Sequence, residues 1–574
     1  MCGIVAVSLA PQTGPGAGSD ARLLARRAVQ RLLHRGPDGF GVSGTERSAV
    51  AMARLRVRSR PADEVPFHGV GAQPAHAYNG EVYTVGGRDG QGPFRVPSGG
   101  LEEAEAVHGH DHSCLDGMYA LARLTADGTV EVTRDPLGIK PLYLRRGPSG
   151  VAVASEVPAL LEVFGRPAVR PAALAQFLLL GRVVDGGTFF EGIEPVAPGS
   201  RLLLKEGRAE VVAGAAPLPS PAEPGAAEPG PGALREAVGR AVERVLVSDR
   251  PLGLAVSGGL DSTVLAAELS RRGVGGLRTV SVVPQGNGDG VRDLSALGLP
   301  GTAWRDWNHH WVGFGPGDLL DGVADAVAAL GEPTALSSVP MYAALARLAR
   351  ESGIVVLLVG EGADELFGGY RSYLALAGLA AARDFYLTPG RREVVGELLG
   401  AGALRAAEAA LDAALPPATG RGPAEVVRDF EYAHSLEPLL RRADHLLMAQ
   451  GVEGRVPFLH GGVPALAASL PSGALVTRGQ TKVALRRAYA GELPHFRDEV
   501  KKPFRAPLDD WLLGAGRDRV LAELRGHREL LVDAGLRAGG VDALVRRVQE
   551  GGPGTAGPAF GVLTLGAWLA WLAS

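Results

Sequence analysis

The sequence has few cysteines, little net charge and no long hydrophobic run, and each shortage excludes a class of protein. Only Cys2 and Cys114 occur in 574 residues, which excludes a disulfide framework and favours a reducing, cytoplasmic setting. The formal net charge is −3, so the composition does not predict a nucleic-acid partner. The apolar stretch 559–574 is shorter than the ~20 residues that cross a membrane. We expect it to form a buried terminal helix, with no membrane partner.

One low-complexity segment divides the chain. Residues 215–233 are rich in Pro, Ala and Gly, a composition typical of a semi-rigid linker. We therefore predict an N-terminal domain at 1–212, a linker at 213–233 and a C-terminal domain at 234–574.

The two predicted domains differ in their pattern. Short apolar or alternating runs bounded by Gly, Pro and Asp fill the first, for example GIVAVSL and AHAYNGEVYTV; they predict an α+β antiparallel sandwich. In the second, buried strands such as PLGLAV and IVVLLV alternate with helical segments, which predicts an α/β parallel sheet. After about residue 375 the pattern becomes mostly helical.

The hexapeptide SGGLDS, Ser257 to Ser262, lies between a predicted strand and a predicted helix. Gly258 and Gly259 allow close backbone approach, and a helix N-terminus offers free N–H groups to an anion. The alternative is a simple Gly turn with a helix cap. Asp261 repels phosphate, and its presence is explained if Mg²⁺ lies between the carboxylate and the phosphates.

A second acidic turn follows another predicted buried strand. In VGEGADELFGGY, Glu361, Asp364 and Glu365 either stabilise a helix start through its dipole or serve Mg²⁺ binding and proton transfer at the end of a parallel strand. Lys482 lies in a helical run with Arg486 and Arg487, which by itself favours a solvated helix face. Near phosphates, a lysine would stabilise the charge on leaving pyrophosphate.

Cys2 follows the initiator methionine, where a structural cysteine is rare. If Met1 is removed, the thiol lies beside an α-amine with a pKa near ~8 that can act as a general base. Asn79 and Gly80, at the end of a predicted strand, can form an oxyanion hole. Arg54 can bind a substrate carboxylate through a two-pronged contact.

These motifs together resemble a known family. MCGIVAV, HRGPDG, NGEVY and RDPLGIKPLY are similar to class II glutamine amidotransferase domains of the N-terminal-nucleophile (Ntn) hydrolase type. VSGGLDS, GEGADELFGGY, EGRVPFL and the Lys482 segment resemble the PP-loop ATP pyrophosphatase domain of glutamine-hydrolysing asparagine synthetases. The resemblance implies that Cys2 releases ammonia from glutamine and that ammonia crosses to a second site. There ATP and Mg²⁺ adenylate an acceptor carboxylate, aspartate by default, and ammonia displaces AMP.

The resemblance also implies residue roles. The catalytic candidates are Cys2, Asn79, Gly80, Glu361 as proton acceptor, and Lys482. Candidates for glutamine binding are Arg54, Asn79, Glu81 and Glu102. Candidates for ATP and pyrophosphate binding are Ser257, Gly258, Gly259, Asp261, Ser262, Val280, Gly360 and Lys482. Asp261 and Asp364 are the metal candidates, and a homodimer is left open.

Three departures from the family pattern affect the substrates. The aspartate expected to bind the glutamine α-ammonium falls on Leu101, which leaves Glu102 or Glu103 to replace it and free ammonia as a rival nitrogen source. Residues 284–311 are Gly-rich and carry three tryptophans where the family places a segment near the acceptor pocket. Val359 and His460 replace the usual Ser before GEG and the usual Asp after RVPFL.

Other functions therefore stay open. The same chemistry on another acid, for example a secondary-metabolite intermediate, is the main rival to asparagine synthesis. Intramolecular amide formation, as in β-lactam synthetases or lasso-peptide cyclases, is disfavoured by Cys2 and Asn79. A non-catalytic scaffold is disfavoured by the intact SGGLDS motif and Lys482.

Overall fold

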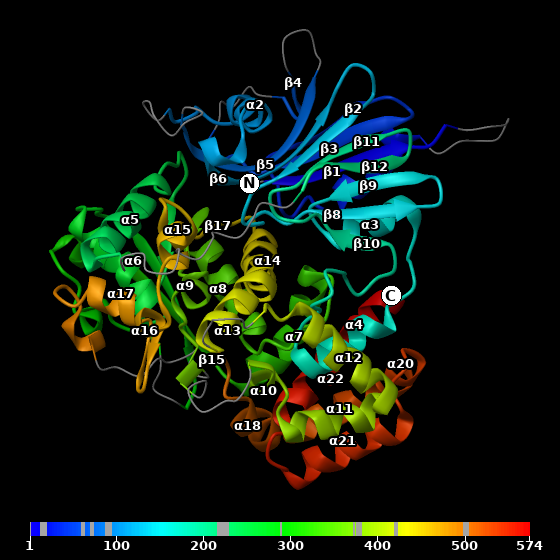
Figure 1. Ribbon diagram of the computed structural model, residues 1–574, viewed down its shortest axis with the longest axis vertical. Coiled ribbons are helices and arrows are strands. Elements are labelled where there is room, and N and C mark those ends of the chain that lie inside the picture. Colours follow the sequence, from blue (N-terminus) through cyan, green and yellow to red (C-terminus); the bar gives the residue numbers. More distant parts are fainter. Residues whose placement is uncertain are drawn as a thin grey trace.

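The computed structural model describes residues 2–11, 20–58, 64–68, 74–86, 95–214, 229–286, 290–370, 373–374, 382–417, 423–497 and 504–574. Two antiparallel sheets, a parallel sheet and a group of helices make up this part of the chain (Figure 1). Most of the predicted linker, residues 215–228, lies outside the described residues. The domain boundaries stay a prediction.

The N-terminal part is a sandwich of two six-stranded sheets, as the alternating runs predict. In spatial order, the first sheet contains β10 (Ile193–Pro195), β8 (Tyr143–Gly147), β9 (Gly150–Ala154), β1 (Cys2–Leu9), β3 (Ser48–Arg54) and β2 (Phe40–Gly44). The second contains β12 (Arg208–Ala213), β11 (Arg201–Lys205), β7 (Val130–Arg134), β6 (Leu115–Leu124), β5 (Ala75–Val85) and β4 (Phe67–His68).

The two-residue period of β1 decides where Cys2 points. Cys2, Ile4 and Ala6 belong to the apolar core shared with β5 and β6 of the second sheet. Val5 and Val7 belong to the other core, which they share with helix α1 (Ala21–Gln30), packed against β1 and β3. Since alternate side chains of a strand face opposite ways, Cys2 points between the sheets.

Four helices accompany the sandwich: α1 (Ala21–Gln30), α2 (Leu101–Gly109), α3 (Val157–Phe164) and α4 (Pro171–Leu180). Helix α2 packs against β5 and β6, while α1 and α3 pack against each other and against the first sheet. Helix α4 instead contacts three helices of the C-terminal part, α11 (Pro389–Leu399), α12 (Ala401–Ala414) and α22 (Ala556–Ala573). The two parts are thus joined by packing as well as by the chain.

The C-terminal part contains a five-stranded parallel sheet, as predicted. Its order is β15 (Asn308–Phe314), β14 (Arg278–Pro284), β13 (Leu252–Ala255), β16 (Val356–Leu358) and β17 (Glu453–Arg455). The chain moves outward from β13 to β14 and β15, then returns to β16 on the other side of β13. In open α/β sheets, ligands bind at the carboxyl ends of the strands where the order reverses. The loops after β13 and β16, which carry SGGLDS and GEGAD, meet at that point.

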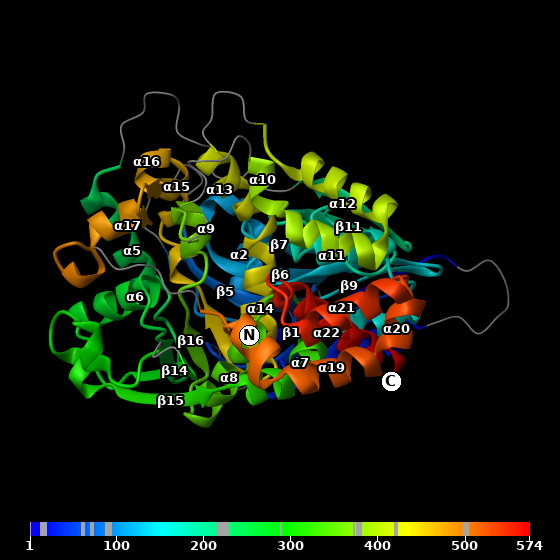
Figure 2. The same ribbon diagram turned by 90° about the horizontal axis from the view of Figure 1, so that it is seen from below.

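Helices surround this sheet and extend beyond it (Figure 2). The first group is α5 (Pro231–Arg244), α6 (Leu260–Arg271), α7 (Pro316–Leu330), α8 (Ser338–Glu351) and α9 (Ala363–Phe367). The later helices are α10 (Ala382–Tyr386), α11 (Pro389–Leu399), α12 (Ala401–Ala414), α13 (Pro423–His434), α14 (Leu436–Met448), α15 (Val463–Ala468), α16 (Ser472–Leu475), α17 (Val483–Ala488), α18 (Leu508–Asp510), α19 (Arg517–Gly526), α20 (Arg528–Asp533), α21 (Ala538–Glu550) and α22 (Ala556–Ala573). A short hairpin joins β18 (Val476–Thr477) and β19 (Gln480–Thr481).

The C-terminal helix α22 is apolar around its whole circumference. Within the described ranges it is the one helix long and apolar enough to cross a membrane, and 72% of its 18-residue window is buried inside the protein. Trp568 is fully buried and donates from Nε1 to the Gly331 carbonyl at 3.0 Å. A helix that is hydrophobic on all sides is typical of a protein core as well as of membranes. The expected buried terminal helix is therefore observed.

Candidate active sites

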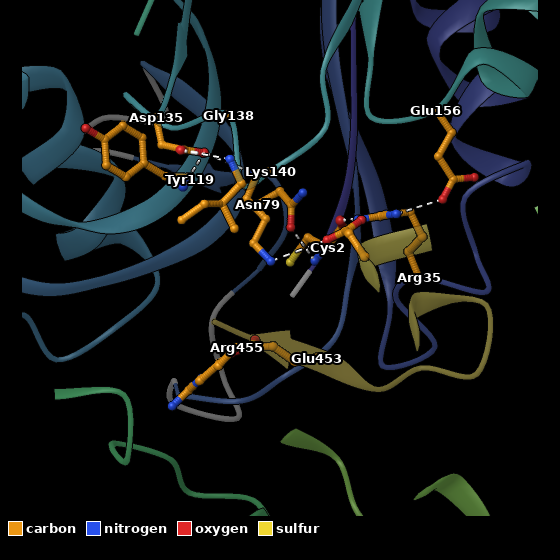
Figure 3. A network of polar contacts seen from close by, with 12 residues as sticks. Cys2, Arg35, Asn79, Tyr119, Asp135, Gly138, Lys140, Glu156, Glu453 and Arg455 are labelled. Carbon is orange, nitrogen blue, oxygen red and sulfur yellow. Dashed lines mark hydrogen bonds and ion pairs between the residues drawn. The ribbon is translucent and has the colours of Figure 1, made fainter. Parts of the chain in front are cut away.

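Cys2 begins β1 and lies between the two sheets, with 5% of its surface exposed. Its backbone N–H donates to Asn79 Oδ1 on β5 at 3.0 Å. The other end of that amide, Asn79 Nδ2, is buried and has no acceptor among the described residues. Asn79 is thus anchored through its oxygen and presents an unused N–H₂ group beside the cysteine (Figure 3). Unpaired buried donors are rare and require an explanation.

Burial raises the pKa of the Cys2 thiol, while the nearby N-terminal charge and Arg54 act to lower it. Arg54 ends β3 and pairs directly with Cys2 across the two strands. Its guanidinium also lies 5.1 Å from the centre of the Phe67 ring. The predicted nucleophile and the predicted carboxylate anchor are therefore cross-strand neighbours.

Gly80 pairs with Tyr119 on β6. A Cβ at this position would lie 2.1 Å from the Met118 carbonyl oxygen, so only glycine allows the two strands this close approach. The structure thus places both predicted oxyanion-hole residues, Asn79 and Gly80, consecutively on the strand that faces Cys2.

The glutamine candidates Glu81 and Glu102 have different surroundings. Glu102 accepts from the Ser98 backbone N–H at 2.8 Å and pairs with Arg95 at 2.8 Å, with about a third of its side chain exposed. Glu81 is buried and pairs with Arg58 Nη1 at 3.2 Å. Burial and the neighbouring Glu453 raise the pKa of Glu81 to about 7.

Glu103, the other replacement for the missing aspartate, is also buried. It accepts from Arg58 Nη1 at 3.1 Å and from the Val82 backbone N–H at 3.2 Å. Burial and Glu81 raise the pKa of Glu103. Its carboxylate is therefore already bonded to the Arg58 side chain and to the backbone of Val82 on β5.

Sequence reasoning missed that the C-terminal part reaches this site. Strand β17 brings Glu453 and Arg455, both fully buried, beneath Cys2 (Figure 3). Arg455 pairs with Glu453 at 2.6 Å and approaches Glu81 at 3.7 Å. Burial acts to raise the pKa of Glu453, but Arg455 holds it below the usual value. The motif EGRVPFL was noted, but nothing in its letters indicates that its charges face the other domain.

The second site is a cavity of about 910 Å³ at the carboxyl ends of β13 and β16. It brings together all the predicted ATP, pyrophosphate and metal candidates. They are Ser257, Gly258, Gly259, Asp261, Ser262, Val280, Gly360, Asp364 and Lys482, and the predicted proton acceptor Glu361 lines the same cavity. The volume lies in the range of ligand pockets.

The SGGLDS loop is ordered by its own hydroxyls. Ser262 Oγ accepts from the Ser257 backbone N–H at 3.1 Å and donates to the Gly259 carbonyl at 3.2 Å. Gly258 has φ +80°, a left-handed conformation that favours glycine. The backbone of Gly360 approaches so closely that a Cβ there would lie 3.1 Å from Asp261 Cβ. Both loops are therefore shaped by glycines at their contact.

Lys482 is buried, with 2% of its surface exposed, and does not lie on a solvated helix face. Its Nζ forms ion pairs with Asp261 and, at 2.6 Å, with Asp364. Burial acts to lower the pKa of Lys482, but the two carboxylates outweigh it and raise the pKa. Gly369 makes this cluster possible, since a Cβ there would lie 1.8 Å from Asp364 Oδ1.

The two aspartates fit a magnesium ion. Their carboxylates converge on the Lys482 ammonium beside the SGGLDS loop, and each side chain keeps about a fifth of its surface exposed, which leaves carboxylate oxygen accessible to an ion. No group of three or more metal-binding side chains occurs within the described ranges. A Mg²⁺ site does not require such a group, because Mg²⁺ is commonly held by one or two carboxylates together with substrate phosphates.

Glu361 contacts a cavity residue that the sequence analysis did not select. Arg442 on α14 donates to Glu361 Oε1 at 2.6 Å and to Ser338 Oγ at 2.7 Å. Its guanidinium lies 4.9 Å from the centre of the Tyr342 ring. Burial raises the pKa of Glu361.

The divergent stretch 284–311 does not line this cavity, as far as its residues are described. Trp307 is buried and donates from Nε1 to the Val274 carbonyl at 2.6 Å, whereas Trp311 is 46% exposed beneath the Arg292 guanidinium. Val291 of this stretch nevertheless packs against the SGGLDS loop, since a Cβ on Gly258 would lie 3.1 Å from Val291 Cγ2, so the bearing of the stretch on the acceptor pocket stays a prediction. Val359 does line the cavity. His460 pairs across the domains with Asp116 at 2.8 Å.

Two family models match the chain. Residues 233–570 match the asparagine synthase model and residues 103–213 match the glutamine amidotransferase domain model. The first match includes the helices after residue 515, beyond the motifs noted in the sequence. Residues 2–102, which carry Cys2 and Asn79, fall outside both matches.

Curated relatives match over most of their length. A protein of Mycobacterium tuberculosis, provisionally named a glutamine-hydrolyzing asparagine synthetase, is 28% identical over 89% of this chain and 88% of its own. Asparagine synthetase [glutamine-hydrolyzing] 1 of Bacillus subtilis is 25% identical over the same shares. Among solved structures, the allosteric regulatory enzyme of purine biosynthesis covers 44% of this chain and 60% of that one at 15% identity. Its TM-score of 0.26 adds nothing to the fold derived above.

Proposed function

The chain belongs to the asparagine synthase family, and on that premise we propose how its two sites divide the work of a glutamine-dependent amidotransferase. The activity is of the asparagine synthetase type, a carbon–nitrogen ligation that uses glutamine and ATP. In the proposal, Cys2 releases ammonia from glutamine and the 910 Å³ cavity activates and amidates an acceptor acid. The observation that carries it is the gathering of every phosphate and metal candidate in that cavity.

At the first site, the Cys2 thiolate attacks the side-chain amide carbon of glutamine after Met1 is removed, and the α-amine takes the thiol proton. The developing oxyanion accepts hydrogen bonds from Asn79 Nδ2 and the Gly80 N–H. The α-ammonium returns the proton to the leaving nitrogen, so collapse expels ammonia, and water then hydrolyses the thioester to glutamate and frees the thiol. The support is the unused Nδ2 group of Asn79, held beside Cys2 by the 3.0 Å bond to its oxygen. A donor aimed where charge develops is worth about 10²–10³ in kcat.

At the second site, an acceptor carboxylate oxygen attacks the α-phosphorus of ATP and pyrophosphate leaves, which gives an acyl adenylate. Ammonia then attacks the acyl carbon and AMP leaves. Ser257, Ser262 and the backbone of Gly258 and Gly259 hold the departing phosphates, and Lys482 stabilises their charge. Asp261 and Asp364 would hold Mg²⁺, which would neutralise phosphate charge. Glu361 takes the proton from the attacking ammonia, for which its raised pKa is suited.

The default acceptor is aspartate. The second candidate is an acid with an apolar body, and one wall of the cavity favours it. Leu336 lines the cavity with 37% of its surface exposed. Leu345, Phe504 and Leu508 also line the cavity. Exposed large apolar side chains in a pocket commonly contact ligand.

Release of AMP and pyrophosphate tests the proposal. We expect both products with glutamine, ATP, Mg²⁺ and one acid from a panel of aspartate and bulkier carboxylic acids. The variant Cys2→Ala should lose synthesis from glutamine and keep synthesis from ammonium salts. If Cys2→Ala gives this result and mass spectrometry shows that the active wild-type protein retains Met1, the α-amine of Cys2 is excluded as the base. If the glutamine-dependent rate of pyrophosphate release is unchanged in Cys2→Ala, the role of Cys2 is refuted.

We also propose a cytoplasmic location. Cys2 and Cys114 are both free thiols and both buried, a state that reducing compartments maintain.

A further inference from the structure

Helix α14 contacts both reaction centres through two residues, Arg442 and Asp444. Arg442 reaches the synthetase cavity, and Asp444 reaches the residue that holds the Cys2 carbonyl. The helix lies below the N-terminal sheets and above α13 (Figure 1), and it packs against α7, α8 and β17. None of the roles assigned above uses this connection.

At the glutaminase end, Arg35 links α14 to Cys2. Arg35 is fully buried; its Nε donates to the Cys2 carbonyl at 3.1 Å and its Nη2 to Asp444 Oδ2 at 2.6 Å. Its third contact, from Nη1 to Glu156 at 2.7 Å, fixes the guanidinium within the N-terminal part (Figure 3). Lys140 Nζ lies 3.3 Å from the other oxygen of Asp444. The position of Asp444 therefore bears directly on the backbone of the nucleophile.

At the synthetase end, Arg442 holds the residue proposed to take the proton from ammonia. A guanidinium 2.6 Å away stabilises the glutamate anion and offsets part of the rise in pKa that burial gives Glu361. A proton accepted by Glu361 therefore weakens its bond to Arg442. Arg442 is itself only 6% exposed, so loss of that partner leaves an unpaired buried charge, which is strongly destabilising. When Glu361 moves, a shift of α14 that keeps Arg442 paired is therefore favoured over a fixed helix with an unpaired Arg442.

Helix geometry makes α14 a link between the two ends. Residues two positions apart in an α-helix point about 200° apart, since each residue advances by ~100°. Arg442 and Asp444 thus leave opposite sides of one rigid turn, and each is fixed by a short, buried, charge-assisted hydrogen bond. Bonds of this kind are roughly twice as strong as neutral ones.

We propose that α14 couples the two sites, so that filling the synthetase cavity changes glutamine hydrolysis through Arg442, Asp444 and Arg35. Asp444 and Arg35 are positioning residues in this scheme, because they touch neither substrate nor the reacting atoms. The inference rests on the proposed function, since it needs Cys2 to hydrolyse glutamine and the cavity to bind ATP.

The first measurement is a coupling ratio. It is kcat/KM for glutamine hydrolysis with saturating ATP, Mg²⁺ and the active acid, divided by kcat/KM without them. We expect the wild-type ratio to differ from 1 by at least ~5-fold, the low end of typical coupling between sites. Absence of any glutaminase activity or of AMP formation would instead refute the proposed function, so these are measured first.

The variants separate the α14 connection from the interface as a whole. Asp444→Asn keeps shape and a hydrogen-bond acceptor but removes the charge, and its ratio should fall to about 1. The matched control is Glu437→Gln on the same helix, where Glu437 pairs across the interface with Arg134 at 3.6 Å and touches no residue that holds Cys2. Its ratio should stay at the wild-type value. A wild-type ratio of 1, or equal loss in both variants, would overturn the proposal.

Binding provides a second test that needs no turnover. Coupling between sites is reciprocal, so glutamine should shift the Kd of ATP with Mg²⁺ for the Cys2→Ala protein by at least ~5-fold in calorimetry. In Cys2→Ala with Asp444→Asn the shift should vanish while ATP still binds. An equal shift in both proteins would overturn the proposal, even if Asp444→Asn lowered glutaminase activity for reasons of folding.

Discussion

Replacement of Lys482 by methionine tests the synthetase cavity most directly. Methionine retains the length of the side chain and removes its charge. Lys482 is 2% exposed and is the partner of both Asp261 and Asp364. The variant therefore leaves two carboxylates facing each other without the cation between them.

The magnitude follows from burial. Removing one partner from a fully buried ion pair costs ~3–5 kcal/mol. Because the side chains of Asp261 and Asp364 keep 21% and 23% exposure, water repays part of this, and we take the lower end, about 3 kcal/mol. In turnover, loss of a charge that stabilises leaving pyrophosphate should lower kcat by about 10²–10³.

The assay is pyrophosphate release at saturating ATP and ammonium, with glutamine hydrolysis in the absence of ATP as a check on the fold. Added Mg²⁺ should raise the melting temperature of Lys482→Met more than that of the wild type, since the freed carboxylates bind the ion. Lys482→Arg, which retains the charge, should lie between the two in turnover. Pyrophosphate release by Lys482→Met within threefold of the wild-type rate would refute the reasoning.

Three further predictions concern other parts of the molecule. Asn79→Ala should lower kcat for glutamine hydrolysis by about 10²–10³ and leave ammonium-dependent synthesis intact; equal loss of both would point to misfolding. Gly369→Ala places a Cβ 1.8 Å from Asp364 Oδ1 and should weaken ATP binding by tenfold or more, about 1.4 kcal/mol, in calorimetry. Burial raises the pKa of Glu332 to about 7 against the pull of Arg441. The stabilisation from its proton is therefore complete below about pH 4.5 and lost as pH rises through 7, so wild type should lose stability relative to Glu332→Gln across that window in urea titrations.

Much of the fold was predictable because the strands with buried faces carry a clear pattern. The ranges GIVAVSL, AHAYNGEVYTV and GMYALARL became β1, β5 and β6, and the buried runs around SGGLDS and GEGAD became β13 and β16. The strands β11 and β12 at one edge of the second sheet were missed, because RLLLK and RAEVVA show no signal that distinguishes an edge strand from a loop.

The candidate sites were predictable where chemistry is local and hidden where it depends on contact between distant segments. SGGLDS forms its loop from residues within one hexapeptide, so its letters suffice. Lys482 has a helical, basic context that favours a surface position, and only the arrival of Asp261 and Asp364 explains its burial. Strand β17 is three residues long and two of them are charged, a pattern that by itself contradicts a buried strand.

The charges at the domain interface explain why these two sites occur within one compact arrangement. Arg35 and Lys140 come from the N-terminal part and Asp444 from α14, and all three are buried only because the parts are in contact. Buried ion pairs contribute little net stability compared with apolar packing, but an unpaired member is costly. Within the N-terminal part Arg35 pairs with Glu156, but its second guanidinium nitrogen and Lys140 pair with Asp444, so the interface favours the register that brings Asp444 to these two cations. That same register brings Glu453 and Arg455 beneath Cys2. The surroundings of Cys2 are therefore completed by charged residues of the C-terminal part.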